Sequence, residues 1–147
     1  MPTLWTIGYE RLPPDALVAE LEAAGVRRLL DVRYRAQSRR PGMSKTKLAA
    51  RLAEHGIAYE HRREFGTPPD IRPLFRSGAT QRAREELRPY LEETAARELD
   101  ALAAELTQRG ARRTALLCLE AEPAHCHRRV VAEQLRERVP SLRVIDL

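Results

Sequence analysis

The feature that most constrains this chain is a pattern that it repeats three times: a helical stretch, a glycine and then a short apolar run. The three copies read LEAAGVRRLLDV, LAEHGIAYE and LTQRGARRTALLCLE. Glycine commonly follows the last turn of a helix, and the apolar runs are typical of strands. Strands that alternate with helices are joined by right-handed crossovers and form a mainly parallel sheet. The pattern therefore predicts an α/β fold: a single three-layer domain over residues 1–147, with helices on both faces of the sheet.

The remaining elements follow from periodicity and from the residues that begin and end helices. Strands are expected at residues 3–9, 26–33, 57–61, 111–120 and 142–147. Helices are expected at residues 13–25, 44–55, 81–109 and 123–138. The third of these helices should kink or restart at Pro89, because proline lacks the backbone N–H. Residues 62–80 are crowded with glycine and proline and are expected to form a loop.

Composition and the N-terminal residues indicate the compartment. The chain has 147 residues, of which 43% are hydrophobic, and no run approaches the ~20 apolar residues that cross a bilayer. The N-terminal MPTLWTIGYE lacks the basic and apolar regions of a secretory signal. We therefore expect a cytoplasmic protein with no membrane partner. In a reducing compartment, Cys118 and Cys126 are expected to form no disulfide. The oligomeric state is not predicted.

Basic residues are concentrated in one segment of the chain. Residues 32–53 contain none of the 21 acids but seven of the 26 basic residues, namely Arg33, Arg35, Arg39, Arg40, Lys45, Lys47 and Arg51. A segment of one charge sign attracts phosphate groups, on nucleotides or on nucleic acids. The alternative is a solvated basic loop that acidic helices nearby balance.

Polar residues stand at the carboxyl ends of the expected strands, where open α/β sheets bind ligands. Tyr9 follows the first strand, and Asp31 and Arg33 end the second and share one face of it. Asp31 and Arg33 form either a structural ion pair or a carboxylate beside an anion-binding guanidinium. Glu120 ends the most apolar strand, at a position suited to a general acid or base, although a structural role is the alternative.

The segment HCHRR, residues 125–129, is expected to open a helix. Backbone N–H groups and the positive end of the helix dipole favour an anion there, and Arg128 could bind a phosphate or carboxylate. The same setting lowers the pKa of a thiol, so that Cys126 is a candidate nucleophile and His127 a candidate for proton transfer. The alternative for Cys126 is simple packing.

Several common motifs are absent from the sequence. A Cys-x5-Arg phosphate loop built on either cysteine needs arginine at position 124 or 132, and both positions are alanine. No G-x-G-x-x-G or Walker motif occurs, so that the cofactor, if there is one, is unknown. The cysteines and histidines of residues 118–127 fit no standard zinc spacing, and no metal site is expected.

Three blocks of the sequence resemble one known family. They are TIGYE, then GVRRLLDVRYRAQSRRPGMSKTKLAARLAEHGIAYEHRREFG, and LLCLEAEPAHCHRRVVAEQL. In these blocks the chain is similar to the DUF 488 family, a domain of unknown function. The resemblance implies a small α/β domain and no particular activity. The positions that it implies for a polar site are Tyr9, Asp31, Arg33, Ser38, Glu120, Cys126, His127 and Arg128.

These observations lead to one preferred hypothesis and two alternatives. The preferred one is a small enzyme that binds a phosphate-bearing substrate, a nucleotide or nucleic acid, and uses a carboxylate in hydrolysis or transfer. The catalytic candidates are Asp31, Glu120, Cys126 and His127, and the substrate-binding candidates are Tyr9, Arg33, Ser38, Arg39, Arg40 and Arg128. The first alternative is a non-catalytic module that binds nucleic acid through residues 33–51. The second is a redox protein that acts through the thiol of Cys126.

Overall fold

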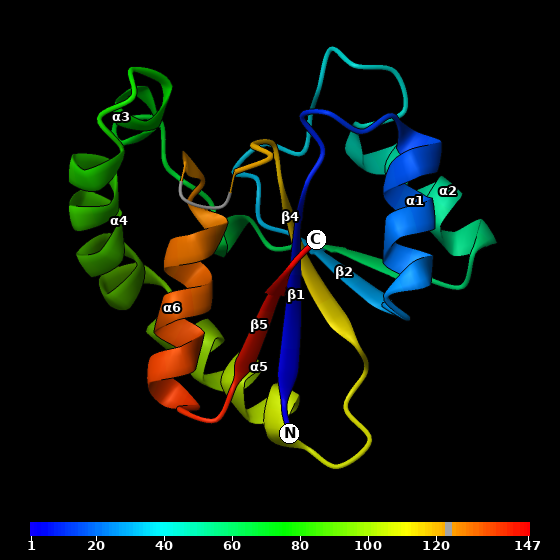
Figure 1. Ribbon diagram of the computed structural model, residues 1–147. Helices are drawn as coiled ribbons and strands as arrows, with labels where there is room; N and C mark the ends of the chain where they lie inside the picture. The colour runs from blue at the N-terminus through cyan, green and yellow to red at the C-terminus, as the bar shows by residue number, and fades with distance from the viewer. Residues whose placement is uncertain (123–124) are drawn as a thin grey trace.

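Five parallel strands form one sheet in the order β3-β2-β4-β1-β5, in a computed structural model that describes residues 1–122 and 125–147. The strands are β1 (Thr3–Gly8), β2 (Arg28–Asp31), β3 (Ala58–His61), β4 (Thr114–Cys118) and β5 (Arg143–Asp146). Their carboxyl ends meet at one edge of the sheet, at the top in Figure 1. The predicted parallel α/β architecture is confirmed.

Helices cover both faces of the sheet and make the domain three-layered (Figure 1). Helices α1 (Pro14–Ala23) and α2 (Lys45–Glu54) lie on one side. The other side carries α3 (Arg72–Arg76), α4 (Thr80–Thr94), α5 (Ala96–Thr107) and α6 (Arg128–Arg138). None of the helices in the described part of the chain combines the length and the apolar character needed to span a membrane.

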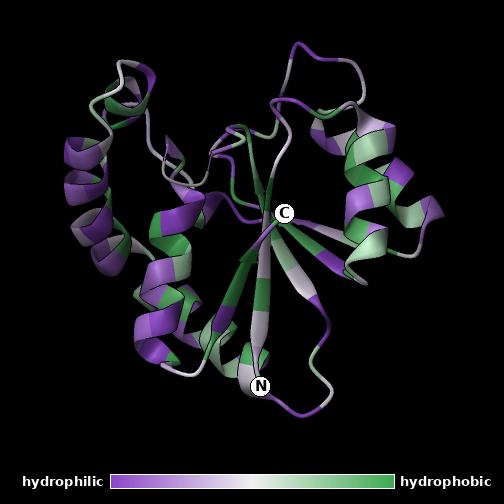
Figure 2. Ribbon diagram, viewed as in Figure 1, coloured by the Kyte–Doolittle hydropathy of each residue, from purple (hydrophilic) through white to green (hydrophobic). Residues whose placement is uncertain are grey.

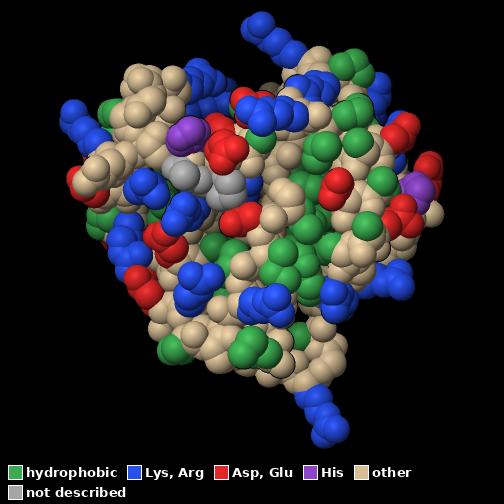
Figure 3. All heavy atoms as spheres, viewed as in Figure 1, with side chains coloured by type: hydrophobic (Ala, Val, Ile, Leu, Met, Phe, Trp, Pro, Cys, Tyr) green, Lys and Arg blue, Asp and Glu red, His purple; other side chains and the backbone are tan. Residues whose placement is uncertain are grey.

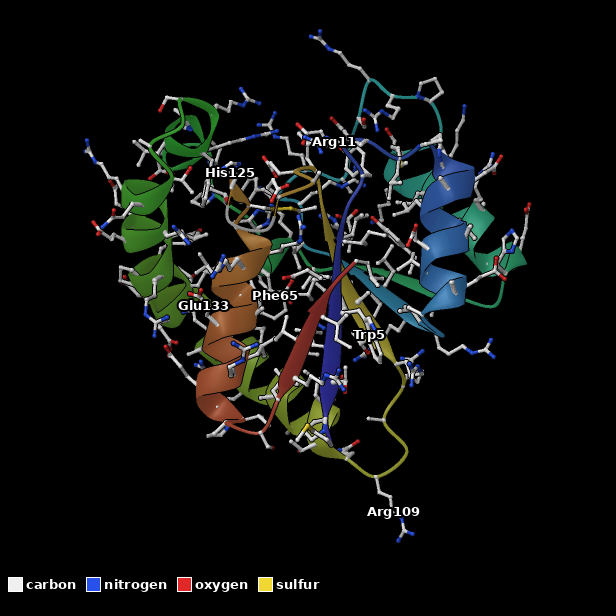
Figure 4. All side chains as sticks on the ribbon, viewed as in Figure 1. Trp5, Arg11, Phe65, Arg109, His125 and Glu133 are labelled. Carbon is white, nitrogen blue, oxygen red and sulfur yellow. A yellow bond between two sulfur atoms is a disulfide. The ribbon has the colours of Figure 1, made fainter. Side chains whose placement is uncertain are left out.

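Two hydrophobic cores lie on opposite faces of the sheet. Successive residues of a strand point to opposite faces, so that each strand contributes to both cores. Leu29 packs under α1 and α2, whereas Leu30 packs with the core of the other face. Trp5 and Phe65, labelled in Figure 4, belong to the two different cores. The hydrophobic surfaces of the helices accordingly turn inward in Figure 2.

Residues 62–80 are more ordered than the loop that the sequence predicts. They contain a 3₁₀ turn at Arg63–Phe65 and the short helix α3. Phe65 and Ile71 are buried in the core and fix this segment against the domain. Pro73 stands in the first turn of α3, where the lost N–H costs no hydrogen bond. Helix α3 could not be predicted from the sequence because a helix of five residues is too short to show periodicity.

The long helical stretch is interrupted at a different residue from the one predicted. Pro89 lies inside α4, and the break falls at Ala95, between α4 and α5. Ala95 is fully buried, so that tertiary packing and not the proline sets the position of the break. The expected start of the last helix near Pro123 falls outside the described residues, and α6 itself begins at Arg128.

The topology creates a crevice at the carboxyl edge. Strands β1 and β4 are neighbours, but the chain continues from β1 to α1 on one face and from β4 to α6 on the other. Because the two connections cross to opposite faces of the sheet, the loops that follow these adjacent strands diverge. Open α/β sheets bind ligands in the crevice between such loops.

Candidate functional site

A pocket of about 130 Å³ occupies this crevice. It is lined by side chains that follow three different strands: Tyr9 after β1, Arg33 after β2 and Glu120 after β4. His127 and the helix α3 close it from the other side. The full lining is Tyr9, Arg33, Tyr34, Arg35, Gln37, Thr67, Arg72, Phe75, Arg76, Leu119, Glu120 and His127. Four of the predicted site residues therefore meet in one cavity.

Asp31 and Arg33 form a buried, bidentate ion pair. Arg33 Nε and Nη2 donate to the two Asp31 carboxylate oxygens at 2.9 and 2.7 Å. Although burial lowers the pKa of Arg33, its bonds to Asp31 outweigh this and raise it above the usual value. The Tyr59 hydroxyl also donates to Asp31, and burial together with this bond raises the pKa of Tyr59. Asp31 is fully buried and outside the pocket lining, so that the structure places it as the partner that orients Arg33.

Glu120 is the one carboxyl group among the described residues that line the pocket. Burial raises its pKa above the ordinary glutamate value, and this effect exceeds the opposing influence of the Arg128 guanidinium. A group of this kind keeps its proton to higher pH and is suited to general-acid chemistry. The Cys118 Sγ lies 3.4 Å from Glu120 Oε2.

Arg128, predicted from the sequence to bind an anionic ligand, lies next to the pocket and directs its guanidinium to the backbone. Its side chain is fully buried, and its guanidinium donates to the backbone carbonyl oxygens of Glu120 and Ala121. It also lies 3.4 Å from Cys118 Sγ, and it is not among the residues that line the pocket. Arg128 therefore holds the backbone that carries Glu120. The sequence does not reveal this role, because it does not indicate which way the guanidinium points.

The fold brings the two cysteines next to each other. Cys118 at the end of β4 and Cys126 just before α6 have Cα atoms 7.3 Å apart, which is beyond the about 4.4–6.8 Å that a disulfide usually spans. The fold places the start of α6 beside the end of β4, and the sequence does not show this proximity. Both residues are buried outside the pocket lining, so that the Cys126 sulfur does not face the cavity.

The same region holds three atoms of metal-ligand type. The sulfur atoms of Cys118 and Cys126 and a ring nitrogen of His127 lie within 4.8 Å of one another. The Arg128 guanidinium lies 3.4 Å from Cys118 Sγ, and this positive charge disfavours a metal cation at the cluster. We therefore propose no metal site at this cluster.

His127 is a buried, neutral imidazole. Burial lowers its pKa to about 4, despite the opposing effect of the hydrogen bond to the Val32 carbonyl. The Nε2 atom lies 2.6 Å from that carbonyl oxygen and must donate to it. The Nδ1 atom therefore carries the lone pair and lies 3.8 Å from Cys126 Sγ. His127 lines the pocket as a fixed, uncharged group.

The buried imidazole predicts a loss of stability in acid. The pKa of His127 is the ordinary 6.5 in the unfolded chain and about 4 in the folded chain. Between pH 6.5 and pH 4, His127 is therefore protonated in the unfolded state but not in the folded state. The free energy of unfolding should therefore fall by about 3 kcal/mol as pH drops from 7 to 4. Urea titrations across this range measure the loss. His127→Gln, which can still donate to Val32, should remove most of it, whereas His55→Gln at an exposed site should not.

Three arginines of the pocket form no ion pair with any carboxylate that the structure describes. Arg35, Arg72 and Arg76 all line the cavity, and within residues 1–122 and 125–147 none of them forms an ion pair. Burial, followed by the charges of Arg76 and Arg35, lowers the pKa of Arg72. Guanidinium groups that repel one another in this way are stabilised by a bound anion. Arg72 and Arg76 are not among the residues predicted from the sequence, where their only signal is the four-residue spacing within a segment expected to be a loop.

Thr67 adds an unsatisfied hydroxyl to the pocket. Its side-chain oxygen is buried and has no hydrogen-bond partner within the described residues. Buried polar atoms nearly always have a partner, so that one without any next to a cavity indicates a place for a ligand atom or a water. Thr67 also lies in the segment that was expected to be a loop, and no sequence pattern singles it out.

A second hollow adjoins the pocket, and we call it the basic groove. It is lined by Tyr34, Arg35, Gln37, Ser38, Arg39, Arg40, Lys45, Lys47, His61, Arg63 and smaller residues between them. Ser38 shapes the loop through hydrogen bonds with Ser44 and the Arg40 backbone. The Arg40 guanidinium donates to three carbonyl oxygens of the segment 9–12 and holds the turn after β1. Arg39 is exposed. Ser38, Arg39 and Arg40 thus lie in the groove and not in the pocket.

The fold and the pocket together define a class of protein. It is a parallel α/β domain with a positively charged pocket between two adjacent strands, β1 and β4, whose following helices lie on opposite faces of the sheet. Residues 13–135 match the model of a family described as "Domain of unknown function DUF488". The chain belongs to this family, which confirms the resemblance seen in the sequence. No curated protein and no solved structure matches the chain. The family description assigns no activity, and function must be argued from the pocket.

Proposed function

We propose that the protein is an enzyme that binds a phosphate-bearing substrate in the pocket and uses Glu120 as a general acid in hydrolysis or group transfer. One observation supports the proposal. Glu120, whose pKa is raised, lies in the same cavity as three guanidinium groups that form no ion pair with any carboxylate of the described residues. Perturbed ionisable groups that converge in a cleft are typical of catalytic sites.

Each group has a separate role in this proposal. Arg35, Arg72 and Arg76 bind the oxygens of the phosphate, since guanidinium groups match phosphate geometry and charge. The Thr67 hydroxyl gains its missing hydrogen bond from the same ligand. In hydrolysis the oxygen of a water molecule forms the new bond to phosphorus and loses a proton to solvent, while the bond from phosphorus to the leaving oxygen breaks and protonated Glu120 donates its proton to that oxygen. Asp31 and Arg128 act indirectly, by holding Arg33 and the backbone of Glu120 in place.

Replacing Glu120 by glutamine tests the catalytic part of the proposal. Glutamine keeps the size and polarity but has no proton to give, so that turnover should fall about a hundredfold or more while ligand affinity stays within about threefold. Turnover is measured on dinucleotides and on phosphate esters of simple alcohols, whose alkoxide leaving groups require a proton, and binding is measured by calorimetry. Glu122→Gln is the matched control, because Glu122 is exposed and outside the pocket lining. Wild-type binding without turnover of any probe would favour the non-catalytic binding module.

Removing one arginine tests the anion-binding part. Arg72→Ala should weaken the binding of pyrophosphate by about tenfold or more, because a hydrogen bond to a charged group contributes about 1.5–3 kcal/mol. Arg109→Ala is the control, since Arg109 lies at the opposite end of the molecule in Figure 4. Calorimetry at fixed ionic strength measures both. Equal effects of the two substitutions would show that the pocket is not the anion site.

A further inference from the structure

We infer that the substrate is a single strand of nucleic acid, with a terminal phosphate in the pocket and the following nucleotides along the basic groove. This inference rests on the proposed function and names its substrate class. Three independent features of the described residues support it: the size of the pocket, the unpaired charge of the groove and the position of Tyr34 between them.

The pocket is too small for a whole nucleotide. Its volume is about 130 Å³, whereas sites for small organic ligands usually enclose about 300–1,000 Å³. It can therefore hold a phosphate and its nearest atoms, and the rest of the substrate must lie outside. The adjoining basic groove offers about 650 Å³. Tyr34, Arg35 and Gln37 line both hollows, so that a ligand can pass from one to the other.

The groove carries more positive charge than a single nucleotide can match. Its lining contains Arg35, Arg39, Lys45, Lys47 and Arg63 and no carboxylate. Among the residues that the structure describes, neither Arg39 nor either lysine forms an ion pair. Figure 3 shows basic side chains along the upper rim of the molecule, above the carboxyl ends of the strands. A polynucleotide supplies one phosphate per nucleotide and can reach such a series of cations.

Tyr34 provides an aromatic surface where the two hollows meet. The Arg63 guanidinium lies 4.3 Å from the centre of its ring, and Arg63 Nη2 donates to its hydroxyl at 2.8 Å. Gly66 fixes the backbone beneath it, because a Cβ at that position would stand 2.5 Å from the Tyr34 Cα. The Arg63 guanidinium covers one face of the ring, and an unpaired base would stack on the other face. Bases of a duplex are already stacked, and this favours a single strand.

Fluorescence anisotropy with the full chain tests the inference. The probes are a labelled ten-nucleotide single strand with a terminal phosphate at either end, the same strand without it, the matching duplex and a nucleoside monophosphate. We expect the phosphorylated single strand to bind at least tenfold more tightly than the monophosphate and the duplex. Equal affinity for the strand and the monophosphate would overturn the inference, and so would equal affinity for the duplex.

Groove variants separate this inference from the proposed function. Arg39→Ala/Lys47→Ala should weaken strand binding about tenfold and reduce the slope of log K against log salt by about 1.4, at about 0.7 per lost phosphate contact. Arg109→Ala/Arg136→Ala removes the same charge at exposed positions elsewhere and should change neither. If both double variants behave alike while monophosphate binding persists, the inference fails and the proposed function stands. If Arg72→Ala leaves monophosphate binding unchanged, the proposed function fails.

Discussion

Replacing Asp31 by alanine should lower the free energy of unfolding by about 3–5 kcal/mol, because it leaves the Arg33 charge buried without its partner. Asp31 is fully buried, and Arg33 is 6% exposed. The carboxylate also accepts hydrogen bonds from the Arg33 backbone N–H and the Tyr59 hydroxyl, and both donors lose their acceptor. Urea unfolding at pH 7 measures the change.

The double variant Asp31→Ala/Arg33→Met identifies the source of this loss. If the uncompensated charge dominates, removing the guanidinium as well should restore about half of the lost stability or more, since an apolar replacement has no charge to desolvate. A single variant that costs less than about 1 kcal/mol would contradict the buried ion pair. Pyrophosphate binding should weaken in both variants, because Arg33 loses its native orientation in the single variant and is absent from the double variant.

Replacing Gly8 by alanine should cost about 4 kcal/mol or more and remove ligand binding with it. A Cβ on Gly8 would stand 1.7 Å from the Glu120 carbonyl oxygen and 3.0 Å from Arg128 Nη1. The conflict is with backbone, which no side-chain rotation relieves. The end of β1 or the backbone of Glu120 must therefore move. Thermal and urea unfolding measure the stability, and calorimetry with pyrophosphate measures the site.

Gly110→Ala is the control for this prediction. Gly110 has φ of +77°, and apart from its two chain neighbours no heavy atom of residues 1–122 and 125–147 lies within 4 Å of the position that a Cβ would occupy there. Alanine should therefore cost only the strain of the left-handed conformation, about 1 kcal/mol. Comparable losses in the two variants would mean that the contact between β1 and the Glu120 backbone is not tight.

The fold could be predicted from the sequence because its signal is repeated. Each copy of the helix, glycine and strand pattern indicates a crossover, and together they define a parallel sheet whatever the strand order. The placement of Tyr9, Arg33 and Glu120 in one pocket follows from the same reasoning, because the carboxyl ends of parallel strands share an edge. The strand order depends on long-range packing, and the sequence patterns do not contain it.

The parts of the site that were not predicted depend on the direction of side chains and on a short helix. Arg128 looked like a ligand-binding residue, but its guanidinium turns inward to backbone carbonyls. The proximity of Cys118 and Cys126 could not be predicted, because it depends on the fold placing the start of α6 beside the end of β4. Arg72 and Arg76 were missed because α3 has no buried residue of its own to produce a periodic pattern.

The short helix α3 has a consequence for how the ligand preference of this protein can change. It contributes Arg72 and Arg76 to the pocket, and both are exposed, whereas its Leu74 and Phe75 pack against the core. Substitutions of the two arginines can therefore alter which ligands are recognised without weakening the interior of the domain. Ligand specificity can therefore change through substitutions at these two exposed positions. The strand ends that carry Arg33 and Glu120 are constrained more tightly, because substitutions there also affect folding.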